Sequence, residues 1–188
     1  MPAGYVGELI AAQGDGPALT NTVTATSLLN GQGIVVQGAS ALRYLGQSIT
    51  VRGYGRISTV ITTPGTLTLD LRLGSIVVAT SGALTLSTTA KTNVSWFLDW
   101  ELDLRTLAGT VKPATASFFH MGRLTSEALG ATTVAGEAKS MLLPVSAPAV
   151  GNTFDPTAAA SWDFFGTWSV ASASNSIQVH SFKIFSND

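Results

Sequence analysis

Three acidic residues at alternate positions, Asp99, Glu101 and Asp103, are the group in this sequence best placed to do chemistry. On a β-strand they share one face and follow one another at about 7 Å, from a rise of roughly 3.4 Å per residue. Carboxylates at that spacing suit a calcium site completed by loops, or the acid pair of a glycosidase. Arg105 follows on the same face, and an Arg or Lys from a neighbouring strand would make a cross-strand charge ladder. We favour the ladder and predict no catalytic, cofactor-binding or metal-binding residues.

The other reactive side chains form no recognisable motif. The two histidines, His120 and His180, fall in predicted strands and show no HxH, HxxxH or HExxH spacing. Asp163 and His180 would need a nucleophilic serine, and the sequence holds no G-x-S-x-G elbow. Residues 53–56 begin like a phosphate-binding loop but lie in a strand pattern and open no helix. We therefore expect the protein to be non-enzymatic and to bind no cofactor.

Strict alternation of apolar and polar residues predicts the elements that position these side chains. In residues 66–73 every second residue is a leucine, and in residues 94–104 one face carries Val94, Trp96, Leu98, Trp100, Leu102 and Leu104. A period of two is the signature of a strand with one buried and one exposed face. The strands predicted in this way are Ile34–Gln37, Ser48–Val60, Thr66–Leu73, Ser75–Ala79, Ala83–Leu86, Asn93–Thr106, Ala116–Leu124, Ala138–Leu143, Ser161–Val170 and Ser176–Phe185.

These strands and their connections predict an all-β fold, a two-sheet, jelly-roll-like sandwich of about 8–10 antiparallel strands. Residues 123–139 hold two glycines and a β-branched pair, so we expect a loop with at most one helical turn. Prolines keep residues 144–160 out of a helix or a central strand. Glycines in the middle of two strands, Gly53 with Gly55 and also Gly122, suggest bulges or sharp bends.

The chain divides into an N-terminal arm, residues 1–32, and a sandwich domain, residues 33–188. Glycine and proline interrupt every pattern in the arm, although residues 19–29 are compatible with an edge strand. We expect the arm to contact a neighbour rather than contribute to the core. Residues 1–12 lack the basic start and the apolar run of a signal peptide or membrane anchor, so we expect synthesis in a host cytoplasm and no membrane partner.

Composition favours a subunit of an assembly. Charged residues make up 11% of the 188 residues, against roughly 25% in an average domain, and hydrophobic residues make up 45%. The ten basic residues are dispersed, so no nucleic-acid partner is expected. Cysteine is absent, which excludes disulfides and thiolate metal sites. The last two strands carry aromatic or aliphatic residues on both faces, and we expect a homo-oligomer, a trimer, to cover the second face.

Three stretches of the chain resemble small structural proteins encoded among the virion genes of tailed bacteriophages. They are residues 55–107 (GRISTVITTPGTLTLDLRLGSIVVATSGALTLSTTAKTNVSWFLDWELDLRTL), residues 140–182 (SMLLPVSAPAVGNTFDPTAAASWDFFGTWSVASASNSIQVHSF) and residues 3–19 (AGYVGELIAAQGDGPAL). The resemblance implies a jelly-roll subunit on the virion, on the capsid surface. A decoration, or cement, protein that binds the major capsid protein is the role it favours, and the family has no catalytic motif to carry over.

A receptor- or glycan-binding module of a phage tail or head fibre is the alternative function. Glycan sites place exposed aromatic rings beside polar side chains, whereas the four tryptophans lie on predicted core faces. Phe97 and Phe118 are the aromatic residues that we expect to be more exposed, and they fit a subunit contact equally well. A polysaccharide-cleaving enzyme that uses Asp99 and Glu101 ranks third.

Overall fold

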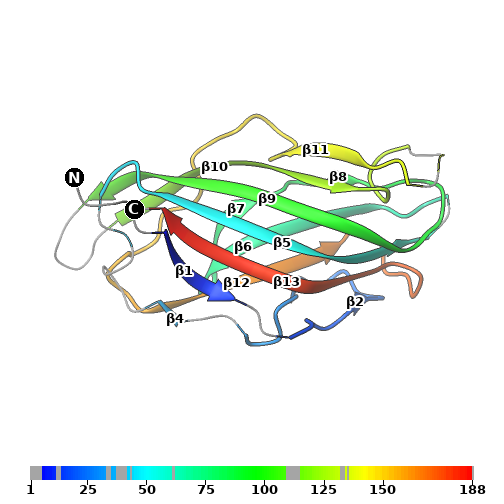
Figure 1. Cartoon of the computed structure of the whole chain (residues 1–188), viewed down its shortest axis with the longest axis horizontal. Helices are drawn as coiled ribbons and strands as arrows, with labels where there is room; N and C mark the ends of the chain where they lie inside the picture. Colours follow the sequence, from blue (N-terminus) through cyan, green and yellow to red (C-terminus); the bar gives the residue numbers. More distant parts are fainter. Residues whose placement is uncertain are drawn as a thin grey trace.

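The computed structural model describes residues 6–11, 14–32, 35–36, 42, 44–60, 62–108, 115–131, 134 and 136–187, with the backbone alone for 6–11 and 35–36. Every regular element in these residues is a β-strand, so the all-β prediction is confirmed (Figure 1). Each of the ten predicted strands is present, with ends that differ by two residues at most. The strands are β1 (Val6–Ala11), β2 (Leu19–Thr20), β3 (Thr26–Ser27), β4 (Val35–Val36), β5 (Ser48–Thr59), β6 (Thr66–Leu73), β7 (Ile76–Thr80), β8 (Leu84–Thr85), β9 (Lys91–Ala108), β10 (Thr115–Ser126), β11 (Lys139–Leu143), β12 (Ala160–Trp168) and β13 (Ser176–Asn187).

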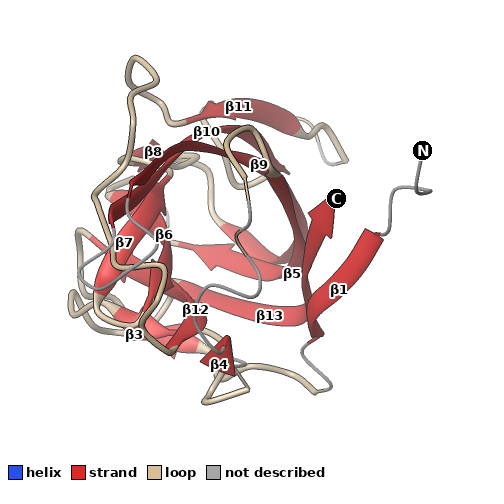
Figure 2. Cartoon of the chain, turned by 90° about the vertical axis from the view of Figure 1, so that its left-hand side faces the viewer, coloured by secondary structure: helices blue, strands red, loops and turns tan. Residues whose placement is uncertain are grey.

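Two antiparallel sheets pack face to face as a sandwich (Figure 2). The seven-stranded sheet has the order β1-β13-β5-β9-β10-β11, with β2 also paired to β13. The six-stranded sheet has the order β3-β12-β6-β7, with β4 paired to β12 and β8 to β6. Among its crossings between the sheets, the chain passes from β5 to β6 and later from β12 to β13, and β5 pairs with β13 while β6 pairs with β12. Such nested pairs are typical of jelly-roll-like sandwiches.

The core lies between the sheets and follows the predicted alternation. In β9 the side chains of Trp96, Leu98 and Trp100 are buried, whereas Phe97 and Glu101, at alternate positions, are exposed. All four leucines of β6 are buried on the facing sheet. The four tryptophans are among the largest fully buried side chains, and they pack in an interior that also holds many leucines.

The segment before residue 33 corrects one expectation. The backbone of β1 pairs with β13, and the short strands β2 and β3 extend one sheet each. Leu19, Leu28 and Leu29 are buried in the common core. The expectation that this segment contributes little to the core is therefore wrong, because its leucines cover the inner face near Gly166 of β12. Contact of the arm with a neighbouring subunit stays a prediction.

A bulge in β13 corrects a second expectation, the apolar second face of the last strand. The register between β13 and β5 shifts between Val179 and Ser181. The extra residue reverses the alternation, so that Val179 before the bulge and Phe182 after it both point into the core. Phe182 stacks on Phe164 of the opposite sheet with ring centroids 4.9 Å apart. On the outer face of the last two strands the apolar residues are thereby reduced to Phe165 and Phe185, and a trimer stays a prediction.

Candidate functional site

Cross-strand rows of side chains cover the outer face of the seven-stranded sheet. One row joins Tyr54 of β5 to Phe97 of β9. Two residues further along each strand, the next row joins Arg52, Asp99 and Arg123 of β10. The third row joins Thr50, Glu101 and Met121 in the same three strands. Because side chains two residues apart on a strand share a face, all three rows face solvent together.

Asp99 is held between two arginines. The Arg123 Nε and Nη2 atoms donate to Asp99 Oδ2 at 3.3 and 3.2 Å, and Arg52 Nε lies 3.7 Å from Asp99 Oδ1. Arg105 Nη2 lies 3.5 Å from Asp103 Oδ2 on the same strand. The predicted charge ladder is therefore present, and Asp99 and Asp103 are engaged with cations of the chain itself. Glu101, between them, has no hydrogen-bond or ion-pair partner among the described residues.

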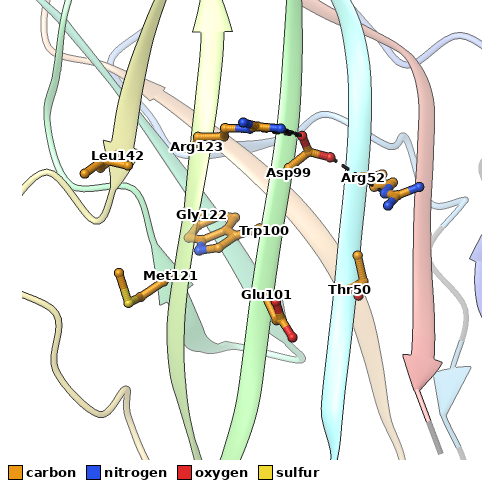
Figure 3. Close-up of a pocket in the computed structure, with 9 residues that line it drawn as sticks. All are labelled: Thr50, Arg52, Asp99, Trp100, Glu101, Met121, Gly122, Arg123 and Leu142. Atoms are coloured by element: carbon orange, nitrogen blue, oxygen red, sulfur yellow. Dashed lines mark hydrogen bonds and ion pairs between the residues drawn. The ribbon is translucent and has the colours of Figure 1, made fainter.

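A groove of about 420 Å³ opens between these rows (Figure 3). Arg123 and Arg52 reach Asp99 from the strands on either side of β9, and Glu101 lies further along β9. We call it the polar groove; its lining residues are Thr50, Arg52, Asp99, Trp100, Glu101, Met121, Gly122, Arg123 and Leu142. Met121 and Leu142 are exposed, so the groove combines ionic groups with an apolar wall.

Gly122 lines the polar groove at the point where β10 lies close to β9. A Cβ on Gly122 would collide with the Asp99 carbonyl and lie 2.8 Å from the Trp100 ring. The absence of a side chain therefore lets β10 pass close over Trp100, which is itself 1% exposed. The predicted bulge does not occur at Gly122, and the reason for glycine there is this close approach.

Tyr54 and Phe97, the aromatic pair, lie beside the polar groove. Their ring centroids are 6.1 Å apart with 39° between the planes, and the residues are 51% and 56% exposed. Trp96 supports them from inside: its Nε1 donates to the carbonyls of Arg56 and Gln178, both at 3.2 Å. Gly55 provides the room, since a Cβ there would lie 3.0 Å from that Nε1.

The expectation of a second exposed phenylalanine, Phe118, is wrong. Phe118 lies on the core face of β10, fully buried, and stacks on Phe154 with centroids 5.3 Å apart. Alternation along β10 turns its neighbour Phe119 outward instead, where the Arg105 guanidinium lies 5.2 Å from the ring centroid. The exposed partner of Phe97 is therefore Tyr54, which the alternation of residues 48–60 also places outward.

His120 lies in β10, as predicted, and its ring is buried. Trp100 Nε1 donates to His120 Nδ1 at 3.2 Å, so the neutral ring carries its proton on Nε2. Burial lowers the pKa of His120 below its usual value of 6.5, because desolvation disfavours the charged ring. The ring also lines a hollow of about 200 Å³ between β7 and residues 144–152.

The structure does not bring the remaining reactive residues together. Asp163 accepts hydrogen bonds from Ser27 Oγ and from the Phe164 backbone N–H, both at 2.7 Å, on the six-stranded sheet. His180 lies on the other sheet, with its Nδ1 2.7 Å from Asp15 Oδ1. In the described ranges no group of three or more His, Asp or Glu side chains is placed to hold a metal ion.

In the part of the chain that the structure describes, no helix is long and apolar enough to cross a membrane.

Comparisons with known proteins add a weak structural similarity. No protein-family model and no curated protein matches the sequence. A solved structure that resembles this one is the CBM2 module of the evolved Dit of Lactobacillus casei BL23 phage J-1, at 8% identity over 98% of each chain. The TM-score is 0.32, which is too low to establish a common fold, so no property of that module is transferred to this chain.

Proposed function

We propose that this chain is a non-enzymatic recognition module of a virion that binds a carbohydrate through the outer face of its seven-stranded sheet. The observation that carries the proposal is the aromatic pair, Tyr54 and Phe97, which is exposed on a rigid strand surface beside a groove of ionic side chains. A sugar ring has an apolar C–H face and a rim of hydroxyls. It therefore suits an aromatic surface with hydrogen-bonding groups next to it.

The support beneath the pair favours binding over a merely tolerated exposure. Trp96 and the glycines of β5 hold β5, β9 and β13 together directly behind Tyr54 and Phe97. Side chains on packed strands are held more precisely than side chains on loops, and little conformational freedom is lost when a ligand binds. Two adjacent large rings left in water on such a surface are typical of an interaction site.

The virion setting is supported by the resemblance of residues 55–107 and 140–182 to phage structural proteins. The low charge of the chain, 11% of its residues, fits a protein that is surrounded by neighbours.

A glycan array probed with the labelled chain tests the proposal. We expect saturable binding to a subset of glycans, and we expect Phe97→Ala and Tyr54→Ala each to reduce affinity about tenfold or more, since stacked rings contribute strongly to binding. Tyr44→Ala is the matched control, because Tyr44 is an exposed tyrosine outside the pair. Absence of glycan binding, or equal effects of Phe97→Ala and Tyr44→Ala, would contradict the proposal.

Capsid decoration is the second candidate function. It is favoured by exposed aliphatic residues in β11 and in the connections beside it, Val134, Leu142, Val145 and Val150. Such residues suit a contact with the major capsid protein or with further copies of this chain, and a trimer stays a prediction. Co-sedimentation with purified capsids, together with native mass spectrometry of the free protein, tests this candidate. A monomer that stays in the supernatant would exclude it.

A further inference from the structure

We infer that the polar groove is a second subsite for the same ligand, and that this ligand is an uncharged oligosaccharide lying along β5 and β9. The inference rests on the proposed function and adds the substrate class and the residue that selects it. Three observations support it: the polar groove is aligned with the aromatic pair, the charges that line the groove are balanced, and Glu101 has no partner among the described residues.

The alignment follows from the strand register. Phe97, Asp99 and Glu101 are successive outward residues of β9, and Tyr54, Arg52 and Thr50 are their counterparts on β5. Four residues separate the first row from the third, which is about 14 Å at roughly 3.4 Å per residue. A single sugar ring cannot cover that length, so a ligand that stacks on the pair and enters the groove must be a chain of sugar units.

The charge of the groove argues against an acidic ligand. Its four ionic side chains, Arg52, Arg123, Asp99 and Glu101, sum to zero. The arginines are already neutralised in part, because both are within 4.0 Å of the same Asp99 carboxylate. Glu101 has no cation within that range among the described residues and would repel a carboxylate or sulfate on the ligand. Lys183 is next to Arg52 in the row, but it does not line the groove.

The hydrogen-bonding capacity of the groove matches sugar hydroxyls. An ionised carboxylate only accepts hydrogen bonds, and the two oxygens of Glu101 can accept from two hydroxyls of one sugar. Arg123 uses Nε and Nη2 on Asp99, which leaves its other N–H groups to donate to hydroxyl or ring oxygens. Met121 and Leu142 form the apolar wall against which the C–H edge of a sugar can pack.

Oligosaccharides of matched length test the inference on the full chain. The neutral probes are hexamers of glucose, galactose and mannose, and the acidic probes are oligogalacturonate and sialylated glycans. We expect the unmodified protein to bind only neutral probes. Glu101→Gln should weaken that binding about tenfold, the usual scale for a lost charge-assisted hydrogen bond. Because the variant groove has a net positive charge, it should also gain binding to the acidic probes.

Asp103→Asn is the matched control, since Asp103 is the next outward carboxylate of β9, pairs with Arg105 and lies outside the groove. It should leave affinity within about twofold of the unmodified protein. Unchanged denaturation midpoints in both variants show that the fold is intact. Preference for acidic probes, or equal effects of Glu101→Gln and Asp103→Asn while Phe97→Ala abolishes binding, would overturn the inference and leave the proposed function standing. If the unmodified protein binds no glycan, or if Phe97→Ala leaves the affinity unchanged, both the inference and the proposed function are overturned.

Discussion

The outer faces of the two sheets both carry arginine, aspartate and aromatic side chains, which are exposed on the seven-stranded sheet and largely covered on the six-stranded sheet. On the seven-stranded sheet the side chains of Arg52 and Arg123 are 68% and 63% exposed. On the six-stranded sheet the side chains of Arg72 and Asp70 are 21% and 13% exposed, and Arg72 Nη2 lies 3.3 Å from Asp70 Oδ2. The Arg72 guanidinium also covers the outward ring of Phe165, 4.1 Å from its centroid.

The difference shows which face is available to a ligand. On the six-stranded sheet, Arg72 forms an ion pair with Asp70 and covers the ring of Phe165. On the seven-stranded sheet the arginines point toward Asp99 and leave the neighbouring rings of Tyr54 and Phe97 in water. We therefore expect the first face to contribute to stability, and we propose the second as the binding surface. The predictions below separate these two roles, beginning with the core on which the second face rests.

Trp100→Ala should have the largest effect on stability. It removes a buried ring from beneath the polar groove together with its hydrogen bond to His120, and core Trp→Ala changes cost roughly 3–5 kcal/mol. Denaturant midpoints of the purified variant measure the loss. A change of less than about 1 kcal/mol would show that the ring is not part of the packed core.

Arg72→Ala tests the closed face. The change leaves the Asp70 carboxylate without its cation and uncovers Phe165, so we expect a loss of about 1–3 kcal/mol in unfolding free energy. The matched change on the open face, Arg52→Ala, should cost under about 0.5 kcal/mol, because exposed ion pairs contribute little. Equal losses from the two variants would remove the distinction between the faces.

The pH dependence of stability tests His120, which lies where the seven-stranded sheet meets the connection between β11 and β12. Its pKa in the folded state is lowered by burial, so below pH 6.5 the unfolded chain binds a proton that the folded chain resists. Stability should therefore fall as the pH decreases from 6.5 toward the lowered pKa, and this contribution should level off below it. His120→Gln should abolish this step in a comparison of midpoints at pH 5 and pH 7.5. A step that persists in the variant would assign it to another group.

Asp99→Ala should have the smallest effect, under about 0.5 kcal/mol, because its side chain is half exposed and its two ion pairs are solvated. Denaturant midpoints with and without a chelator measure it. A larger loss that appears only without the chelator would show that Asp99 holds a metal ion.

The open face could be predicted from the sequence only in part. The alternation in residues 94–104 places Phe97, Asp99 and Glu101 outward, and Arg105 on the same face suggested the charge ladder. The partners of Asp99 could not be named, because Arg52 and Arg123 lie 47 and 24 positions away in sequence and meet it only through strand order. Exposure of Tyr54 follows from alternation, whereas its position beside Phe97 follows from the register of β5 on β9.

Local periodicity by itself determined the all-β class, the ten main strands and the inward face of β6 and β9. It could do so because side chains two residues apart lie on one face whatever the strand pairs with. Tertiary structure alone decided the sheet order, the burial of Leu28 and Leu29, and the bulge that turns both Val179 and Phe182 inward. These depend on backbone pairing between segments far apart in the chain, and a one-residue shift in that pairing reverses which side chains reach the core.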